Sequence, residues 1–224
     1  MQERSLYNMH TQSMDNVLAS NKVLKNTYLL LGMTLAFSAV CAGISMAVGF
    51  PPLPWFLSLA VMLGLLFLVH ATANSPWGLL SVFLFTGFMG AMLGPMLTYY
   101  ASIPGGSQLV LQALGGTAIV FFGLSAYALT TRKDFSYMAG FLFVGMLVVL
   151  VAVIANLFLH IPAMSLAISS AVVLLMSGFI LYDTSRIIHG GETNYIRATV
   201  ALYLDIYNLF IHLLHLLTAL SGDD

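Results

Sequence analysis

The sequence predicts an all-α membrane protein, folded as a bundle of seven transmembrane helices. Of its 224 residues, 60% are hydrophobic and only 7% are charged, whereas a soluble domain carries about 25% charged residues. Seven apolar runs are long enough to cross a bilayer, because one helical crossing takes about 20 residues. The runs are too long and too uniformly apolar for the alternating strands of a β-barrel. A net charge of −1 gives no indication of a nucleic acid partner.

A polar segment precedes the first apolar run. Residues 1–21 lack the short basic stretch followed at once by an apolar core that marks a secretory signal. We therefore expect residues 1–21 to form a polar tail in the cytosol. Residues 22–220 contain no Gly/Ser-rich linker and no obvious repeat, so we expect them to form a single transmembrane domain.

Short segments with turn chemistry separate the seven expected spans. Proline, glycine and polar residues gather in the stretches FPPLP, NSP, IPGG, RKD and HGGE, where helices are expected to end. The spans between these breaks are Val23–Val48, Leu53–Ala71, Trp77–Tyr100, Gln108–Leu129, Tyr137–Leu159, Ala163–Ile188 and Tyr195–Leu220.

The basic residues predict how the bundle is oriented. All seven fall on one side of a seven-span arrangement, and the loops on the other side carry none. Because cytosolic loops carry an excess of lysine and arginine, we predict a cytosolic N-terminus and a C-terminus on the outer side. The seven residues are Arg4, Lys22, Lys25, Arg132, Lys133, Arg186 and Arg197.

Small residues in the third span predict close helix packing. Gly90 and Gly94 form a GxxxG pair just before Pro95. Small residues at this spacing let two helices approach closely in a membrane, so we expect this span to pack tightly on a neighbour. Pro95 lacks the backbone N–H of a helical residue, and we expect the third helix to kink or end there.

Two carboxylates interrupt the last two spans. Asp183 lies about two turns before Gly190 and Asp205 about three turns after Asn194, so both should lie in the cytosolic half of the membrane. Helices joined by a short loop are usually neighbours, and an unpaired charge inside a membrane is costly. We therefore predict that the two acids meet, share one proton and act as a proton-sensitive switch.

Arg186 supports a different interpretation of the same residues. It follows Asp183 by three positions, so the two side chains lie on one helix face. Arg186 could form a purely structural ion pair with Asp183, in which case only Asp205 would need a partner. Both interpretations remain open from the sequence, and Arg186 is a candidate latch for the aspartate pair.

A polar stripe continues along the seventh span. Asp205, Asn208, His212 and His215 are spaced by three, four and three residues, so they share one helix face. We predict that Asn208, His212 and His215 line a path for protons or ions. The alternative is that His212 and His215 lie near the outer interface, where polar side chains are tolerated. Two histidines do not make a metal site, and none is predicted.

Several long stretches resemble the Bax inhibitor-1 family. They include KVLKNTYLLLGMTLAFSA, FTGFMGAMLGPML, ALGGTAIVFFGLSAYALTTRKDFSYMAG and IIHGGETNYIRATVALY, and the similarity runs from residue 20 to residue 218. It is closest to a bacterial branch whose members modulate a membrane-bound AAA protease. The resemblance implies a seven-helix bundle in the bacterial inner membrane, with the last helix near its centre.

The resemblance also implies two activities. Some family members are pH-sensitive leaks for calcium, gated by two aspartates that would correspond to Asp183 and Asp205. In such leaks an arginine of the second helix latches the acids, but the second span here has only His70 as a basic side chain. Arg186 or a histidine would have to replace that arginine. The other activity is non-catalytic modulation of the AAA protease FtsH, a role linked with a cytosolic N-terminal tail.

An enzyme is not expected. Tyr182 and Asp183 match the first half of the intramembrane aspartyl protease motif, but the residues before Asp205 lack the glycines of the second half. The seventh span has no lysine that could bind retinal. We expect no catalytic residue and no cofactor. The expected partners are protons, calcium or other cations, the lipid bilayer and the membrane-bound protease.

Overall fold

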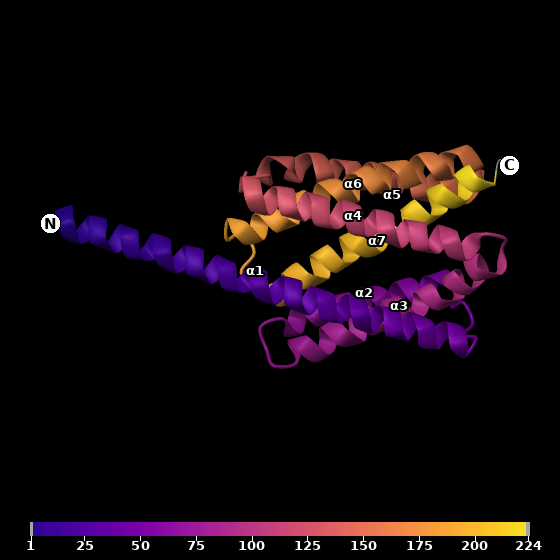
Figure 1. The fold of residues 1–224 in the computed structure, drawn as a ribbon, viewed down its shortest axis with the longest axis horizontal. Coiled ribbons are helices and arrows are strands. Elements are labelled where there is room, and N and C mark those ends of the chain that lie inside the picture. Colours follow the sequence, from indigo (N-terminus) through magenta and orange to yellow (C-terminus); the bar gives the residue numbers. More distant parts are fainter. Residues whose placement is uncertain (1, 223–224) are drawn as a thin grey trace.

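The computed structural model describes the backbone of residues 2–222 and the side chains of residues 20–222. It is 86% helical, and the described part of the chain contains no strand. Seven of its helices contain a stretch long and apolar enough to cross a membrane. The elements are α1 (Gln2–Ala47), α2 (Trp55–Thr72), α3 (Gly78–Ser102), α4 (Gly106–Thr131), the short 3-10 helix η1 (Ser136–Met138), α5 (Ala139–Leu159), α6 (Pro162–Ile188) and α7 (Tyr195–Ser221) (Figure 1).

The seven helices match the seven expected spans, with one large difference at the N-terminus. We expected the first span to begin at Val23, whereas α1 is helical from Gln2 and its first part extends beyond the bundle (Figure 1). Hydropathy reports the preference of a segment for lipid, and a polar segment can continue a helix without entering the membrane. Helix α3 continues through Pro95 to Ser102, so of the two expectations for this proline the end of the helix is wrong.

The helices form two groups, which α7 joins and which also meet directly where α1 contacts α6 and α3 contacts α4. In Figure 1, α1, α2 and α3 lie on one side and α4, α5 and α6 on the other, with α7 crossing between them. Helix α7 contacts α1, α2, α3, α4 and α6. Helix α5 contacts only α6 and η1 among the described elements. Helix α7 is therefore packed against five other helices, whereas α5 is packed against one helix, α6, and the short η1.

The loops gather at two ends of the bundle. His189, after α6, contacts the backbone of Arg132, after α4, and Asn194 contacts the turn between α2 and α3. The loops that carry basic residues therefore lie together, and we call this end the basic end. The turns at residues 48–54, 103–105 and 160–161 connect the helices at the opposite end.

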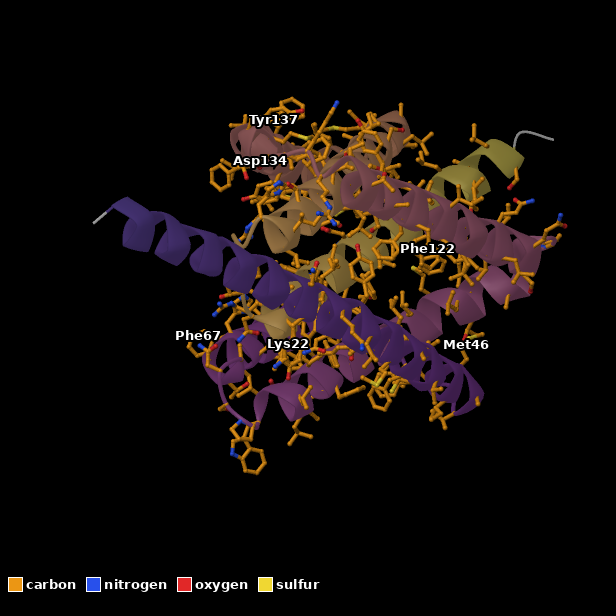
Figure 2. All side chains as sticks on the ribbon, turned by 60° about the vertical axis from the view of Figure 1, so that its left-hand side comes forward. Lys22, Met46, Phe67, Phe122, Asp134 and Tyr137 are labelled. Carbon is orange, nitrogen blue, oxygen red and sulfur yellow. The ribbon has the colours of Figure 1, made fainter. Side chains whose placement is uncertain are left out.

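The outer surface is apolar. Phe67 of α2 and Phe122 of α4 project from the bundle (Figure 2), with 76% and 66% of their surface exposed. Many other large apolar side chains of α2 and α5 are also exposed. A soluble protein rarely exposes apolar patches of this extent, so this surface is suited to contact with lipid tails.

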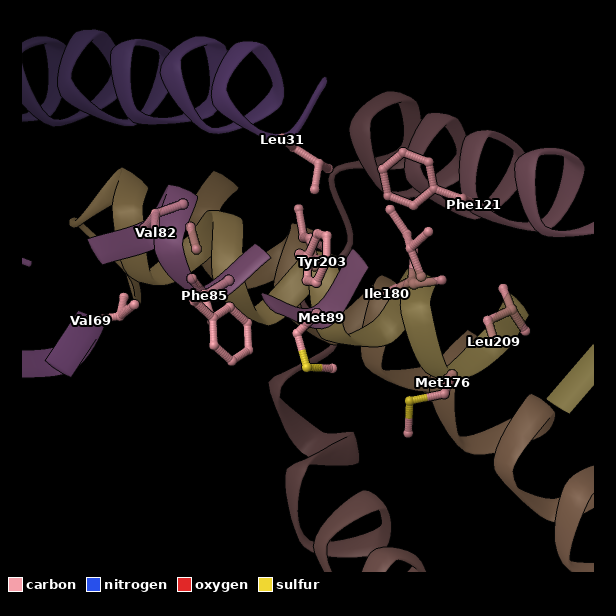
Figure 3. Packing of buried hydrophobic residues seen from close by; sticks show 14 of the residues in the cluster. Leu31, Val69, Val82, Phe85, Met89, Phe121, Met176, Ile180, Tyr203 and Leu209 are labelled. Atoms are coloured by element: carbon pink, nitrogen blue, oxygen red, sulfur yellow. The ribbon is translucent and has the colours of Figure 1, made fainter. Parts of the chain in front are cut away.

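The core is centred on Tyr203 of α7. Its ring packs edge-on against Phe85 of α3, with ring centroids 6.1 Å apart (Figure 3). Its hydroxyl lies 2.7 Å from the hydroxyl of Ser38 in α1. All three residues are buried. A buried hydroxyl needs a hydrogen-bond partner, so this contact fixes the rotation of α7 relative to α1.

Helices α1 and α3 approach closely at the glycine pair, as the small-residue spacing predicted. A Cβ atom on Gly90 would overlap the backbone oxygen of Ser38, and one on Gly94 would overlap Ser45 Oγ. Ser45 Oγ in turn donates a hydrogen bond of 2.7 Å to the carbonyl oxygen of Ala91. The two helices therefore touch through backbone atoms.

Candidate functional site

The loop between α6 and α7 is fixed by Asn194, the N-cap residue of α7. Its Oδ1 accepts hydrogen bonds from the backbone N–H groups of Ile196 and Arg197, at 2.9 and 3.2 Å. Its Nδ2 donates to the carbonyl oxygen of Ala73 at 2.9 Å and to Asn74 Oδ1 at 2.7 Å. One side chain therefore sets where α7 begins and attaches it to the turn before α3.

His189 attaches the end of α6 to the turn that follows α4. Its Nδ1 lies 2.9 Å from the carbonyl oxygen of Ser185, and its Nε2 lies 3.1 Å from that of Arg132. Ser185 Oγ accepts a hydrogen bond of 3.0 Å from the backbone N–H of Phe135. Because both ring nitrogens face carbonyl oxygens, the doubly protonated ring alone can donate to both of them at once.

The two predicted aspartates come together between α6 and α7. Asp205 is 6% exposed, and the side chain of Asp183 is 13% exposed. The two carboxyl groups lie near enough for their charges to interact. Asp205 Oδ2 is buried without a hydrogen-bond partner. A buried polar atom left unpaired is costly.

Arg186 contacts only one of the two aspartates by an ion pair. Its Nη1 lies 3.7 Å from Asp183 Oδ1. No basic side chain between residues 20 and 222 forms an ion pair with Asp205. His70 makes a 2.9 Å contact with the carbonyl oxygen of Leu66 in its own helix. Of the two candidate latches, Arg186 therefore reaches the pair, and it does so through Asp183.

Glu192 extends this set of charges to the basic end. Its carboxylate lies 3.9 Å from Arg186 Nη2 and 3.1 Å from Arg197 Nη2. Burial opposes its ionisation, but hydrogen bonds from Arg197 and from the backbone N–H of Asn194, with the charges of both arginines, lower the pKa of Glu192 below its usual value. Glu192 is therefore ionised at neutral pH. Nothing in the sequence singled out Glu192, because its contacts form only after folding.

The two histidines of the predicted stripe lie at the opposite end. Their Nδ1 atoms share one hydroxyl, that of Ser169, at 3.0 Å for His212 and 2.9 Å for His215. Ser169 can donate to only one ring, so the other ring must donate to it when both are neutral. A cavity of about 760 Å³, formed by α3, α5, α6 and α7, is lined by both histidines and by Ser169.

The predicted stripe is not continuous along this cavity. Asn208, Asp183 and Asp205 are not among the lining residues. Asn208 Nδ2 instead donates a 2.8 Å hydrogen bond to the carbonyl oxygen of Leu204 in its own helix. Between residues 20 and 222, no group of three or more histidine, cysteine or acidic side chains could hold a metal ion.

Comparisons with known proteins agree along almost the whole chain. The sequence model of the family described as "Inhibitor of apoptosis-promoting Bax1" matches residues 20–222. The "Modulator of FtsH protease YccA" of Escherichia coli K12 is 53% identical over 208 residues, which cover 93% of this chain and 94% of that protein.

Other bacterial relatives extend this result. A protein of Escherichia coli O6:H1 with the same identity and coverage is named "Inner membrane protein YccA". A membrane protein of Vibrio cholerae is 50% identical over 215 residues, 96% of each chain. With seven helices able to cross a membrane, the protein is a multi-pass protein of the bacterial inner membrane. The chain belongs to the Bax inhibitor-1 family.

Proposed function

We propose that this protein modulates the membrane-bound AAA protease FtsH without cleaving substrates itself. The observation that carries the proposal is the 53% identity, over 93% of the chain, to a protein named as a modulator of that protease. The aligned region covers 93% of the chain, so the similarity extends well beyond a single helix or loop. The proposed contact with the protease is made by the predicted cytosolic tail, residues 1–21, which precede the membrane-spanning part of α1.

Binding and inhibition test this proposal directly. The full-length protein, reconstituted with FtsH, is expected to co-purify with the protease and to slow its degradation of a membrane substrate. Removal of residues 1–20 is expected to abolish both effects, because the bundle would then lack its contact segment. A double variant, Asp183→Asn with Asp205→Asn, serves as the control and is expected to keep both. Full inhibition by the shortened protein would contradict the role of the tail, and failure of the intact protein to bind would reject the function.

The buried aspartate pair favours a second function, a proton-sensitive leak for calcium or other cations. Asp205 has a buried oxygen without a partner, and the nearby Arg186 is paired with Asp183. When the pair holds a proton, the two carboxyl groups can hydrogen-bond and keep α6 and α7 together. Loss of that proton leaves two negative charges that repel each other and attract a cation. Carboxylate oxygens are the ligands that calcium prefers.

Calcium flux into proteoliposomes tests this second function. The flux is expected to be higher at neutral than at acidic pH, by at most about tenfold per pH unit if one proton is released. Asp183→Asn combined with Asp205→Asn removes the titrating groups and is expected to make the flux independent of pH. The matched control is Asp134→Asn, the same change at an exposed acid outside the pair. An equal pH dependence in the double variant and the wild type would rule out the pair as the switch.

A further inference from the structure

Glu192 is the charged residue closest to the aspartate pair that neither proposed function uses. Its side chain is 14% exposed and lies between two arginines. Its contact with Arg197 is the shorter one: Arg197 Nη2 lies 3.1 Å from Glu192 Oε1, and Arg197 Nε lies 3.3 Å from the same oxygen. Glu192 Oε1 also accepts a 2.9 Å hydrogen bond from the backbone N–H of Asn194. Glu192 is therefore held firmly on its Arg197 side.

Arg186 lies between Glu192 and Asp183. Its two terminal nitrogens are 3.9 Å from the Glu192 carboxylate and 3.7 Å from that of Asp183. Both distances exceed the 2.7–2.9 Å of a close charge-assisted hydrogen bond, which is roughly the length expected if one acid held the arginine alone. Arg186 Nη2 is also 3.4 Å from the carbonyl oxygen of Gly191, and its guanidinium lies over the ring of Tyr182. The position of Arg186 is thus shared between the two acids.

We propose that Glu192 is a positioning residue that draws Arg186 away from Asp183 and thereby raises the pH at which the aspartate pair releases its proton. The inference rests on the second proposed function. The loop between α6 and α7 then regulates the proposed switch, and Arg197 keeps Glu192 in place.

The direction of the effect follows from two charges. The guanidinium of Arg186 stabilises a negative charge on Asp183, and the carboxylate of Glu192 opposes it. Neutralising Glu192 removes the opposing charge and frees Arg186 for Asp183, so proton release moves to lower pH. Neutralising Arg197 moves proton release to higher pH, because Glu192 then keeps only Arg186 as a basic partner and draws it further from Asp183.

The other titratable groups near this end stay unchanged in both variants. Asp205 on α7 faces Asp183 directly. Tyr28 of α1 contacts α6 through Thr184, with 3.4 Å between the hydroxyl oxygens. His189 faces the turn after α4, where Arg132, Lys133 and Asp134 lie. A shift in the titration midpoint of a Glu192 or Arg197 variant therefore reports the substituted charge, because the other titratable groups are the same in every variant.

Infrared spectroscopy measures the protonated carboxyl groups without requiring ion flux. The full-length protein in nanodiscs is titrated, and the C=O bands of the protonated acids are assigned with Asp183→Asn and Asp205→Asn. Glu192→Gln keeps the oxygen that accepts from Asn194 and is expected to move the midpoint to lower pH, by roughly half a unit or more. Arg197→Gln is expected to move it to higher pH. Arg197→Lys keeps the charge and serves as the control with an unchanged midpoint.

The outcomes separate this inference from the function on which it rests. An unchanged midpoint in both Glu192→Gln and Arg197→Gln would overturn the role of Glu192, even if the protein conducts calcium. If the midpoints shift in the two variants but the wild-type protein conducts no calcium, the leak function is rejected and the electrostatic role of Glu192 stands. If Glu192→Gln fails to fold, an unchanged midpoint in Arg197→Gln alone would overturn the role of Glu192.

Discussion

The side chain of Asn194 illustrates how much one residue contributes at the basic end. Its oxygen caps α7, and its amide nitrogen binds the turn between α2 and α3. The pattern of an asparagine just before an apolar run is a known helix-start signal, so the cap could be anticipated. The contacts with Ala73 and Asn74 could not, because those residues are 121 and 120 positions away in the sequence.

Substitution of Asn194 separates its two roles. Asn194→Ala is expected to destabilise the protein by about 1–2 kcal/mol, the usual cost of a lost cap with its partners. Asn194→Asp keeps the oxygen that caps α7 but loses the donor to Ala73. This variant is therefore expected to lose less stability than Asn194→Ala. Hydrogen exchange of the Ile196 and Arg197 amides measures the cap. Equal protection of these amides in the alanine variant and the wild type would show that the cap contributes nothing.

Single residues also show which positions a sequence can single out and which it cannot. Asp183 and Asp205 stand out because a carboxylate in an apolar run is unusual, and the short loop between the helices was enough to expect their meeting. Their role as a switch remains a prediction. Glu192 and Ser169 gave no such signal, because a loop glutamate and a serine in a helix are ordinary until their neighbours are known.

At the scale of helices, the contact between α1 and α3 depends on the absence of side chains. Gly90 lies against Ser38, whose hydroxyl contacts that of Tyr203 on α7. The close approach of α1 and α3 therefore also positions a contact between α1 and α7. The GxxxG spacing predicted the approach, but the partner helix could not be identified from one sequence.

Two glycine substitutions test this contact. Gly90→Ala is expected to destabilise the bundle by about 1–3 kcal/mol, because the added carbon would overlap Ser38 and force the helices apart. Gly32→Ala on α1 is the matched control, since no atom lies within 4 Å of the added carbon. It is expected to be neutral or stabilising by up to about 1 kcal/mol, because alanine favours helix. Unfolding in a graded detergent series provides the comparison, and equal effects of the two changes would contradict the packing argument.

The sequence predicted some helix boundaries well and others poorly, depending on the local signal at each end. The start of α7 at Tyr195 agrees with the expected span because a turn with Gly190 and Gly191 and a capping residue precede it. The expected first span, Val23–Val48, agrees with the apolar stretch Ser20–Ala47, but hydropathy could not show that α1 is helical well before this stretch. Proline was a weak guide inside α3, where the helix runs through Pro95.

At the scale of the whole molecule, composition and basic residues were sufficient for the number of helices and for the grouping of the loops. The orientation of the bundle remains a prediction. The arrangement of helices around α7 was not accessible from hydropathy, which treats each span separately. The cavity at the opposite end could not be predicted either, because four helices contribute to it and no single segment shows a signal.

The sparse contacts of α5 have a consequence for the two ends of the bundle. Among the described elements, helix α5 touches only α6 and η1, yet it supplies Val153, Asn156 and Leu157 to the wall of the large cavity. A tilt of α5 would widen or narrow that cavity at little cost in packing, while the α6–α7 interface around the aspartates kept its shape. A change in bilayer thickness is therefore expected to alter the shape of this cavity without altering the α6–α7 interface around the aspartates.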